Sequence, residues 1–160
     1  MVSPDRGSVR RFLVTGGAGF IGSHVVDALT KRGDAVIVID NLDTGSLDNL
    51  PNALNIIPQK VSDVIGGSIG FIEGSIQDVD LLGHLVNSAD AVIHLAAIAS
   101  VQRCQDDPEI DRAVNFDGLR TIMRLCASKT DSCPVVFASS AAVYGEPTNL
   151  PIRESDSTTP

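Results

Sequence analysis

The stretch that decides the fold is Arg11-Phe12-Leu13-Val14-Thr15-Gly16-Gly17-Ala18-Gly19-Phe20-Ile21-Gly22-Ser23-His24. Its apolar run from Phe12 to Val14 predicts a buried parallel strand. After the glycines, Ile21, Val25 and Leu29 recur at helical spacing and predict a helix with one apolar stripe. Glycine lets the backbone turn sharply and approach a phosphate closely, and a helix start offers unpaired N–H groups to an anion. The order of strand, glycine turn and helix therefore favours a dinucleotide site over a plain glycine-rich turn.

The next strand indicates which dinucleotide is bound. A second apolar run, Ala35 to Ile39, ends in Asp40, at the place where an acidic residue hydrogen-bonds the adenosine ribose hydroxyls of NAD. A 2′-phosphate would face this carboxylate, and one such charge pair at ~4 Å costs ~4 kcal/mol at an effective dielectric of ~20. No arginine follows Asp40 in the segment Asn41-Leu42-Asp43-Thr44-Gly45. NAD is therefore favoured over NADP.

Size and charge narrow the class of protein. The 160 residues have room for one domain, and the net charge of −8 argues against nucleic-acid or anionic-membrane partners. No apolar stretch approaches the ~20 residues of a membrane span. Residues 1–9 form a polar N-terminal tail without the apolar core of a signal peptide. The cysteines, Cys104, Cys126 and Cys133, have no metal-ligand or redox spacing, so we expect no metal site and a reducing, cytoplasmic environment.

Strands and helices alternate along the rest of the chain. Further strands are predicted at 71–76, 91–95 and 135–138, and further helices after Asp78 and after Asp107-Pro108-Glu109. Residues 41–70 read as a long connection, with a short helix predicted after Ser46. The alternation predicts an α/β fold, a Rossmann-type doubly wound parallel sheet.

Several side chains near the predicted strand ends are candidates for a site. The small residues in Ala96-Ala97-Ile98-Ala99 would let the backbone pass close beside a flat cofactor. The alternative is that they only pack tightly under a helix. His94 is a candidate base, although a structural histidine is the favoured interpretation because no carboxylate is paired with it in the sequence. Asn115 lies in a helix body, where asparagine is mildly unfavourable, which favours a role at the site. Ser139-Ser140 follows the last strand, at the carboxyl end where ligands bind in open α/β sheets.

Five motifs follow one another along the chain: Thr15-Gly16-Gly17-Ala18-Gly19-Phe20-Ile21-Gly22-Ser23-His24, Asp40-Asn41-Leu42, His94-Leu95-Ala96-Ala97, Val114-Asn115 and Ser139-Ser140-Ala141-Ala142-Val143-Tyr144-Gly145. In this order they resemble those of the extended short-chain dehydrogenase/reductase family, and within it the NAD-dependent nucleotide-sugar epimerases of the UDP-glucose 4-epimerase type. The resemblance extends over residues 10–160, the expected NAD-binding Rossmann domain. Relatives are about twice this length, so the resemblance implies a sheet that is incomplete at its C-terminal side and a missing sugar-binding domain.

The resemblance also assigns roles to residues. Ser140 would be the catalytic serine, and Ser75 would lie beside the adenine, where the family often carries aspartate. The residues that would contact the cofactor are Gly16, Gly19, Phe20, Ile21, Gly22, Asp40, Asn41, Leu42, Asp43, Thr44, Gly45, Ser75, Ile76, Leu95, Ala96, Ala97, Ile98, Ala99 and Asn115.

The family's catalytic Tyr-x-x-x-Lys is absent from these 160 residues. Tyr144 has Thr148, not lysine, four residues on, and in relatives the pair comes about twenty residues later. The resemblance therefore implies that this chain is the cofactor-binding part of an epimerase and that it is inactive by itself. The complete enzyme would pass a hydride between sugar C4 and NAD through a 4-keto intermediate. A non-catalytic NAD-binding module, a dehydratase and a decarboxylase are the alternatives. Dehydratases carry an acidic pair where Ala141-Ala142 stands here, which favours the epimerase.

The resemblance implies partners as well. A nucleotide sugar, with UDP-sugars favoured, would be the substrate, but the residues present do not select among sugars. The complete protein is expected to form a homodimer through the helix that carries Asn115 and the helix that bears Tyr-x-x-x-Lys in relatives.

Overall fold

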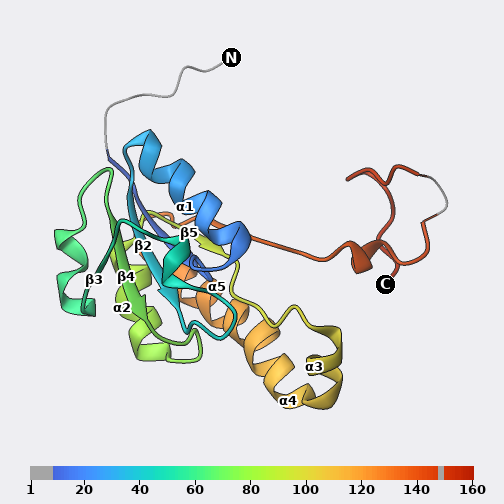
Figure 1. The fold of residues 1–160 in the computed structure, drawn as a ribbon. Coiled ribbons are helices and arrows are strands. Elements are labelled where there is room, and N and C mark those ends of the chain that lie inside the picture. The colour runs from blue at the N-terminus through green and yellow to red at the C-terminus, as the bar shows by residue number, and fades with distance from the viewer. Residues whose placement is uncertain (1–8, 148–149) are drawn as a thin grey trace.

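Residues 9–147 and 150–160 are described by the computed structural model, and they contain an open, six-stranded parallel sheet in the order β3-β4-β2-β1-β5-β6 (Figure 1). The strands are β1 (Arg11–Thr15), β2 (Ala35–Asp40), β3 (Ala53–Asn55), β4 (Ile69–Glu73), β5 (Ala91–His94) and β6 (Val135–Phe137). This Rossmann-like α/β fold confirms the predicted fold class. The predicted tail at 1–9 falls, except for Val9, outside the described residues, as does Thr148.

Helices connect the strands and cover both faces of the sheet (Figure 1). The α-helices are α1 (Phe20–Arg32), α2 (Val79–Ser88), α3 (Val101–Asp106), α4 (Pro108–Asp111) and α5 (Leu119–Ala127). A π-helical segment, η3 (Arg112–Gly118), joins α4 to α5, and the short 3-10 turns are η1 (Leu47–Asn49), η2 (Pro58–Asp63) and η4 (Ala141–Tyr144). Across the described part of the chain, none of these helices combines the length and the apolar character that crossing a bilayer requires.

Two apolar clusters, one on each face of the sheet, form the core. Successive residues of β2 point to opposite faces, so Val36 and Val38 pack with Val26 of α1, whereas Ile37 and Ile39 pack with the cluster under α2 and α5. Every residue of β2 is buried, which explains why this strand reads as a continuous apolar run.

The glycine turn and the helix after it form as predicted, but the buried face of α1 differs from the prediction. Gly22, Val26 and Leu29 are buried, whereas Ile21 is 62% exposed. A Cβ on Gly22 would lie 2.1 Å from the carbonyl oxygen of Gly16, so this glycine must face the turn. That close approach turns Ile21 outward. The helix ends as predicted at Gly33, whose φ of +96° is left-handed.

The connection from 41 to 70 contains structure that the sequence did not predict. β3 pairs with β4 in parallel, and β4 begins at Ile69, earlier than the predicted strand at 71–76. The sequence predicts Gly70 in a loop, yet it lies inside β4. The position is glycine because side chains of Ile56 and Val64 cross directly over it, and an added Cβ would come within 2.6 Å of both. Ser46 caps η1 as predicted, accepting a hydrogen bond from the Asp48 N–H.

The sheet is open at β6. Val136 and Phe137 in this edge strand are 64% and 47% exposed. Beyond β6 the chain runs away from the sheet to η4 and the C-terminus (Figure 1). The apolar edge at β6 agrees with the predicted incompleteness of the sheet on this side.

Candidate functional site

A cavity of about 160 Å³ opens at the carboxyl ends of β1, β2, β4 and β5. Most of the residues predicted to contact the cofactor line it: Gly16, Gly19, Asp40, Asn41, Asp43, Thr44, Gly45, Ser75, Ile76, Leu95, Ala96, Ala97 and Ile98. The lining also includes residues that sequence reasoning missed: Ile39, Gly74, Gln77, Arg103, Ile110 and Val114. The cavity lies where the strand order reverses around β1, the place at which open α/β sheets bind ligands.

The glycine turn forms one wall of the cavity by direct backbone contact. Gly16 has a φ of +69°, and a Cβ there would lie 2.6 Å from the backbone nitrogen of Ala96. Gly19 is the N-cap residue of α1 and makes no side-chain cap. The first turn of α1 thus presents N–H groups that no cap satisfies, as an anion-binding helix start does.

Asp40 joins the end of β2 to the glycine turn. Its carboxylate is buried, with one oxygen accepting a hydrogen bond from the Ala18 N–H at 3.0 Å and the other from the Leu42 N–H at 2.9 Å. A carboxylate has about four lone-pair sites, so these two bonds leave room for donors from a ligand. Asp40 therefore holds the turn in shape and also lines the cavity.

His94 and Thr15 hold the opposite wall. The Thr15 hydroxyl oxygen accepts from the N–H groups of Leu95 and Ala96, at 3.3 and 3.2 Å, and lies 2.7 Å from Nδ1 of His94. With its oxygen accepting from the backbone, the hydroxyl proton points to Nδ1, which leaves His94 neutral with its proton on Nε2. Burial also lowers the pKa of His94. The arrangement supports the structural interpretation of this histidine.

The lowered pKa of His94 predicts how stability changes with pH. The unfolded chain takes up a proton below pH ~6.5 that folded His94 resists, so the free energy of unfolding should fall as the pH drops through that range. Urea unfolding at acidic and neutral pH should show this loss in the wild type and a smaller loss in His94→Asn. His84→Asn, at an exposed histidine of α2, is the matched control for the loss of an imidazole. An identical pH dependence in His94→Asn would contradict the prediction.

Asn115 lies behind the cavity wall and holds it through hydrogen bonds. Its Oδ1 accepts from the Ile98 N–H at 2.8 Å, and its Nδ2 donates to the Ile98 carbonyl at 3.1 Å and to Asp111 at 2.7 Å. It lies in the π-helical segment η3, a conformation that often occurs at functional sites. Asn115 thus fixes the wall residue Ile98 and does not itself line the cavity.

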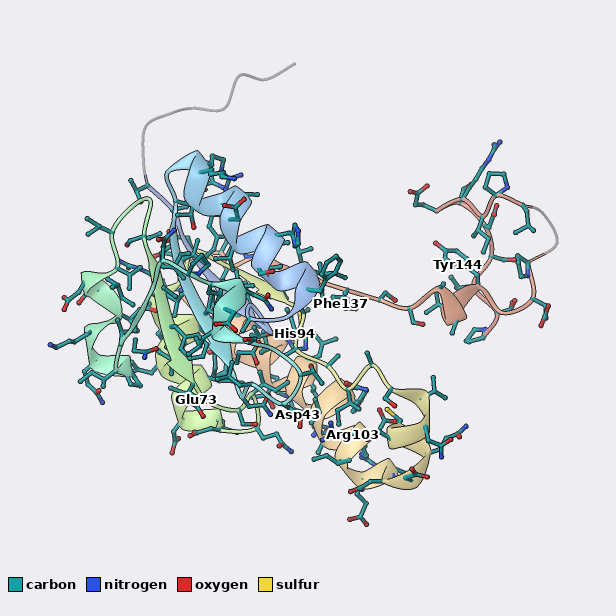
Figure 2. All side chains as sticks on the ribbon, viewed as in Figure 1. Asp43, Glu73, His94, Arg103, Phe137 and Tyr144 are labelled. Carbon is teal, nitrogen blue, oxygen red and sulfur yellow. The ribbon has the colours of Figure 1, made fainter. Side chains whose placement is uncertain are left out.

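A charged pair that the sequence did not predict lies at the cavity. Nη1 and Nη2 of Arg103 in α3 donate to the two carboxylate oxygens of Asp43, which follows β2. These hydrogen bonds raise the pKa of the Arg103 guanidinium, so it stays cationic. Figure 2 shows the two side chains meeting below the sheet.

Other predicted residues lie outside the cavity lining. These are Phe20, Ile21, Gly22, Leu42, Ala99 and Ser140. Phe20 and Ile21 are 81% and 62% exposed at the start of α1. Ser140 is exposed, and its Oγ accepts a hydrogen bond from the Ala142 N–H at 3.2 Å as the N-cap of η4. Tyr144, at the end of η4, lies well apart from His94 and Arg103 (Figure 2).

Comparisons with known proteins agree with this geometry. Residues 12–160 match the model of the NAD dependent epimerase/dehydratase family. The UDP-glucose 4-epimerase of Halalkalibacterium halodurans is 40% identical over 92% of this chain and 40% of that protein. The UDP-N-acetyl-alpha-D-glucosaminuronate decarboxylase of Bacillus cytotoxicus is 38% identical over 92% of this chain and 41% of that protein. The structure of UDP-glucose 4-epimerase from Brucella ovis in complex with NAD is 35% identical and has a TM-score of 0.73, covering 95% of this chain and 42% of that one.

These matches confirm the predicted resemblance in sequence and in fold. The chain spans less than half the length of these relatives, and it aligns with them over nearly all of its own length. The glycine turn, the acid at the end of β2 and the small residues after β5 lie together at one cavity, as the family motifs imply. The chain belongs to the NAD dependent epimerase/dehydratase family.

Proposed function

We propose that the cavity binds NAD and that this chain is the cofactor-binding portion of a nucleotide-sugar 4-epimerase. The observation that carries the proposal is the meeting of the glycine turn, Asp40 and the wall Leu95–Ile98 at the carboxyl ends of the strands. The relatives are a UDP-sugar epimerase and a UDP-sugar decarboxylase, which supports a nucleotide sugar as the substrate of the complete protein.

The residues present fit the proposed cofactor. A Cβ on Gly16 or Gly22 would collide with backbone atoms of Ala96 or of Gly16, so only glycine permits the tight turn against which the pyrophosphate would lie, and the uncapped first turn of α1 would bind its charge. Asp40 would accept hydrogen bonds from the ribose, and Ser75 and Ile76 would lie beside the adenine. At about 160 Å³ the cavity is below the ~300–1,000 Å³ of typical ligand sites, so it would enclose only part of a dinucleotide. Bound NAD would supply a hydride acceptor and donor.

Ser140 is the proposed catalytic residue of this portion. Its hydroxyl would donate a hydrogen bond to the reacting sugar oxygen as negative charge develops there. A serine hydroxyl does not itself remove the sugar proton at neutral pH, so the reaction needs a separate proton acceptor, the role that the tyrosine of the family's Tyr-x-x-x-Lys motif would have in the complete protein.

Besides a dehydratase, which Ala141-Ala142 disfavours, two further alternatives remain for the complete protein. The match to a decarboxylase supports a decarboxylase of the same family about as well as an epimerase at the level of sequence identity. A non-catalytic NAD-binding module is the other alternative, because no Tyr-x-x-x-Lys occurs in the chain. Incubating the complete protein separately with UDP-glucose and with UDP-glucuronate separates the three, since a decarboxylase releases CO₂ from UDP-glucuronate, an epimerase converts a substrate to its C4 epimer without releasing CO₂, and a binding module does neither.

We further propose that the complete protein is a homodimer, with the helical stretch η3–α5 at its interface. Phe116 and Met123 on this stretch are 57% and 49% exposed, which supports a contact surface there. Measuring the mass of the complete protein by light scattering tests this.

The NAD assignment predicts a cofactor preference that depends on Asp40. Wild-type protein should bind NAD more tightly than NADP, and Asp40→Ser should narrow the difference about tenfold, because one charge pair at ~4 Å is worth between ~1 and ~4 kcal/mol. We expect the low end because two backbone N–H groups already donate to this carboxylate. Titration calorimetry with both cofactors measures the ratio. Equal affinities in the wild type would overturn the assignment.

A further inference from the structure

The Asp43–Arg103 pair connects two segments that the sheet holds apart. Asp43 lies in the loop after β2, and Arg103 lies in α3, which follows β5. In the sheet, β2 and β5 flank β1 on opposite sides, so the pair passes over the end of β1, beside the glycine turn. Both residues line the cavity. The ion pair therefore connects the β2 side of the cofactor cavity to the β5 side, and the labelled Asp43 and Arg103 lie close together in Figure 2.

The Asp43–Arg103 contact consists of two hydrogen bonds and is partly exposed to solvent. Both guanidinium nitrogens donate, one to each carboxylate oxygen, and the side chains are 47% and 42% exposed. An Arg–carboxylate pair in this geometry is stronger and more specific than a single hydrogen bond. Because it is partly exposed, it can open and close without unfolding the walls on either side.

Apart from Arg103, α3 is held only to its own side of the cavity, the side that includes Ile98. The helix has no buried residue, its Cys104 thiol donates to the Ile98 carbonyl at 3.5 Å, and Ser100 caps its start. Nδ2 of Asn115 donates to the same Ile98 carbonyl and lies 3.9 Å from the Cys104 sulfur, and Oδ1 of Asn115 accepts from the Ile98 N–H. Arg103 thus connects α3 to the loop after β2, whose far end is held to the glycine turn by hydrogen bonds from the Ser46 N–H and from Asn49 Nδ2 to the Ala18 carbonyl.

We propose that Asp43 and Arg103 form a strap that closes over the bound dinucleotide and slows its release. The proposal rests on the proposed NAD site and adds Arg103 as a residue that retains the cofactor. A cofactor that is regenerated in every turnover has no need to leave, so a closure that opens rarely suits this chemistry. The alternative is that Arg103 contacts the cofactor phosphates directly and that Asp43 competes for it.

Release kinetics distinguish the strap from a direct phosphate contact. The protein is loaded with NADH, mixed with excess NAD in a stopped-flow instrument, and the loss of bound NADH fluorescence is followed. The strap predicts that Asp43→Asn and Arg103→Gln each speed release about two- to fivefold, the range expected for one exposed ion pair. The double variant should release NADH no faster than the single variants, because the strap is already open in each of them.

A matched control comes from a second exposed ion pair, Asp27–Lys31 on α1, away from the cavity lining. Asp27→Asn should leave NADH release at the wild-type rate. Slower release in Asp43→Asn would indicate that the freed Arg103 binds phosphate and would overturn the strap, as would unchanged release in both single variants. If wild-type protein does not bind NADH at all, the proposed function itself fails, and the strap with it.

Discussion

Replacing Gly22 with alanine is expected to weaken NAD binding by at least about a hundredfold and to destabilise the fold by about 3 kcal/mol. The added Cβ would lie 2.1 Å from the Gly16 carbonyl oxygen and 2.7 Å from the Gly17 Cα, both backbone atoms of the glycine turn. No side-chain rotation relieves such a contact, so either α1 or the turn must shift. Because the turn is also packed backbone to backbone against Ala96, the shift would distort the cavity on two sides.

Gly83→Ala is the matched control for this prediction. Gly83 lies inside α2, and a Cβ there would meet only the Leu125 side chain, at an ordinary 3.7 Å. Glycine inside a helix costs about 0.5–1 kcal/mol relative to alanine, so this variant should be slightly more stable and bind NAD normally. Urea unfolding and calorimetric NAD titration of both variants check the contrast. Wild-type NAD affinity in Gly22→Ala would contradict the proposed role of the turn.

The order of elements could be predicted because it depends on short stretches of sequence. A strand, a glycine turn and a helix start are each specified within a few residues, and Asp78 and Asp107 cap the helices they precede by accepting from the Leu81 and Ile110 N–H groups. The acid at the end of β2 follows from the same local pattern. The fold class and most of the cavity lining were therefore accessible from sequence.

What the sequence could not predict depends on contacts between distant segments. The rotation of α1 that buries Val26 and exposes Ile21 is set by Gly22 meeting Gly16, which spacing alone does not reveal. β3 is short, and its pairing with β4 needs the side chains that cross over Gly70. In both cases a glycine that reads as a loop or turn residue is a point of close packing.

At the site, too, the sequence could not predict a contact between distant segments, the one that brings a charged residue to the cavity wall. No arginine follows Asp40 in the sequence, yet Arg103, about sixty residues further on, reaches the same cavity through α3, a helix that the sequence did not predict. Asp43 neutralises the charge of Arg103. Arg103 is therefore not a free cation that would attract the 2′-phosphate of NADP, and Asp40 still favours NAD. Asn115 is a candidate from the sequence because asparagine is unfavourable inside a helix, but its hydrogen bonds to Ile98 depend on the fold and could not be predicted.

Ser140→Ala is expected to lower turnover of the complete enzyme about a hundredfold, the usual cost of removing one donor that stabilises a developing negative charge. NAD affinity should change little, because Ser140 lies outside the cavity lining. The competing explanation is that Ser140 only caps η4, where its Oγ accepts from the Ala142 N–H.

Two further variants separate the catalytic role of Ser140 from the capping role. Ser140→Asp keeps a good N-cap acceptor but, once ionised, has no proton to donate, so it should be as impaired as Ser140→Ala if donation to the reacting oxygen matters and nearly normal if capping alone matters. Ser139→Ala, at the exposed neighbour, should have a milder effect. Turnover with UDP-glucose and stability in urea are measured for all three variants. Wild-type turnover in Ser140→Ala would remove the proposed role, because a donor to the developing charge cannot be lost without slowing the reaction.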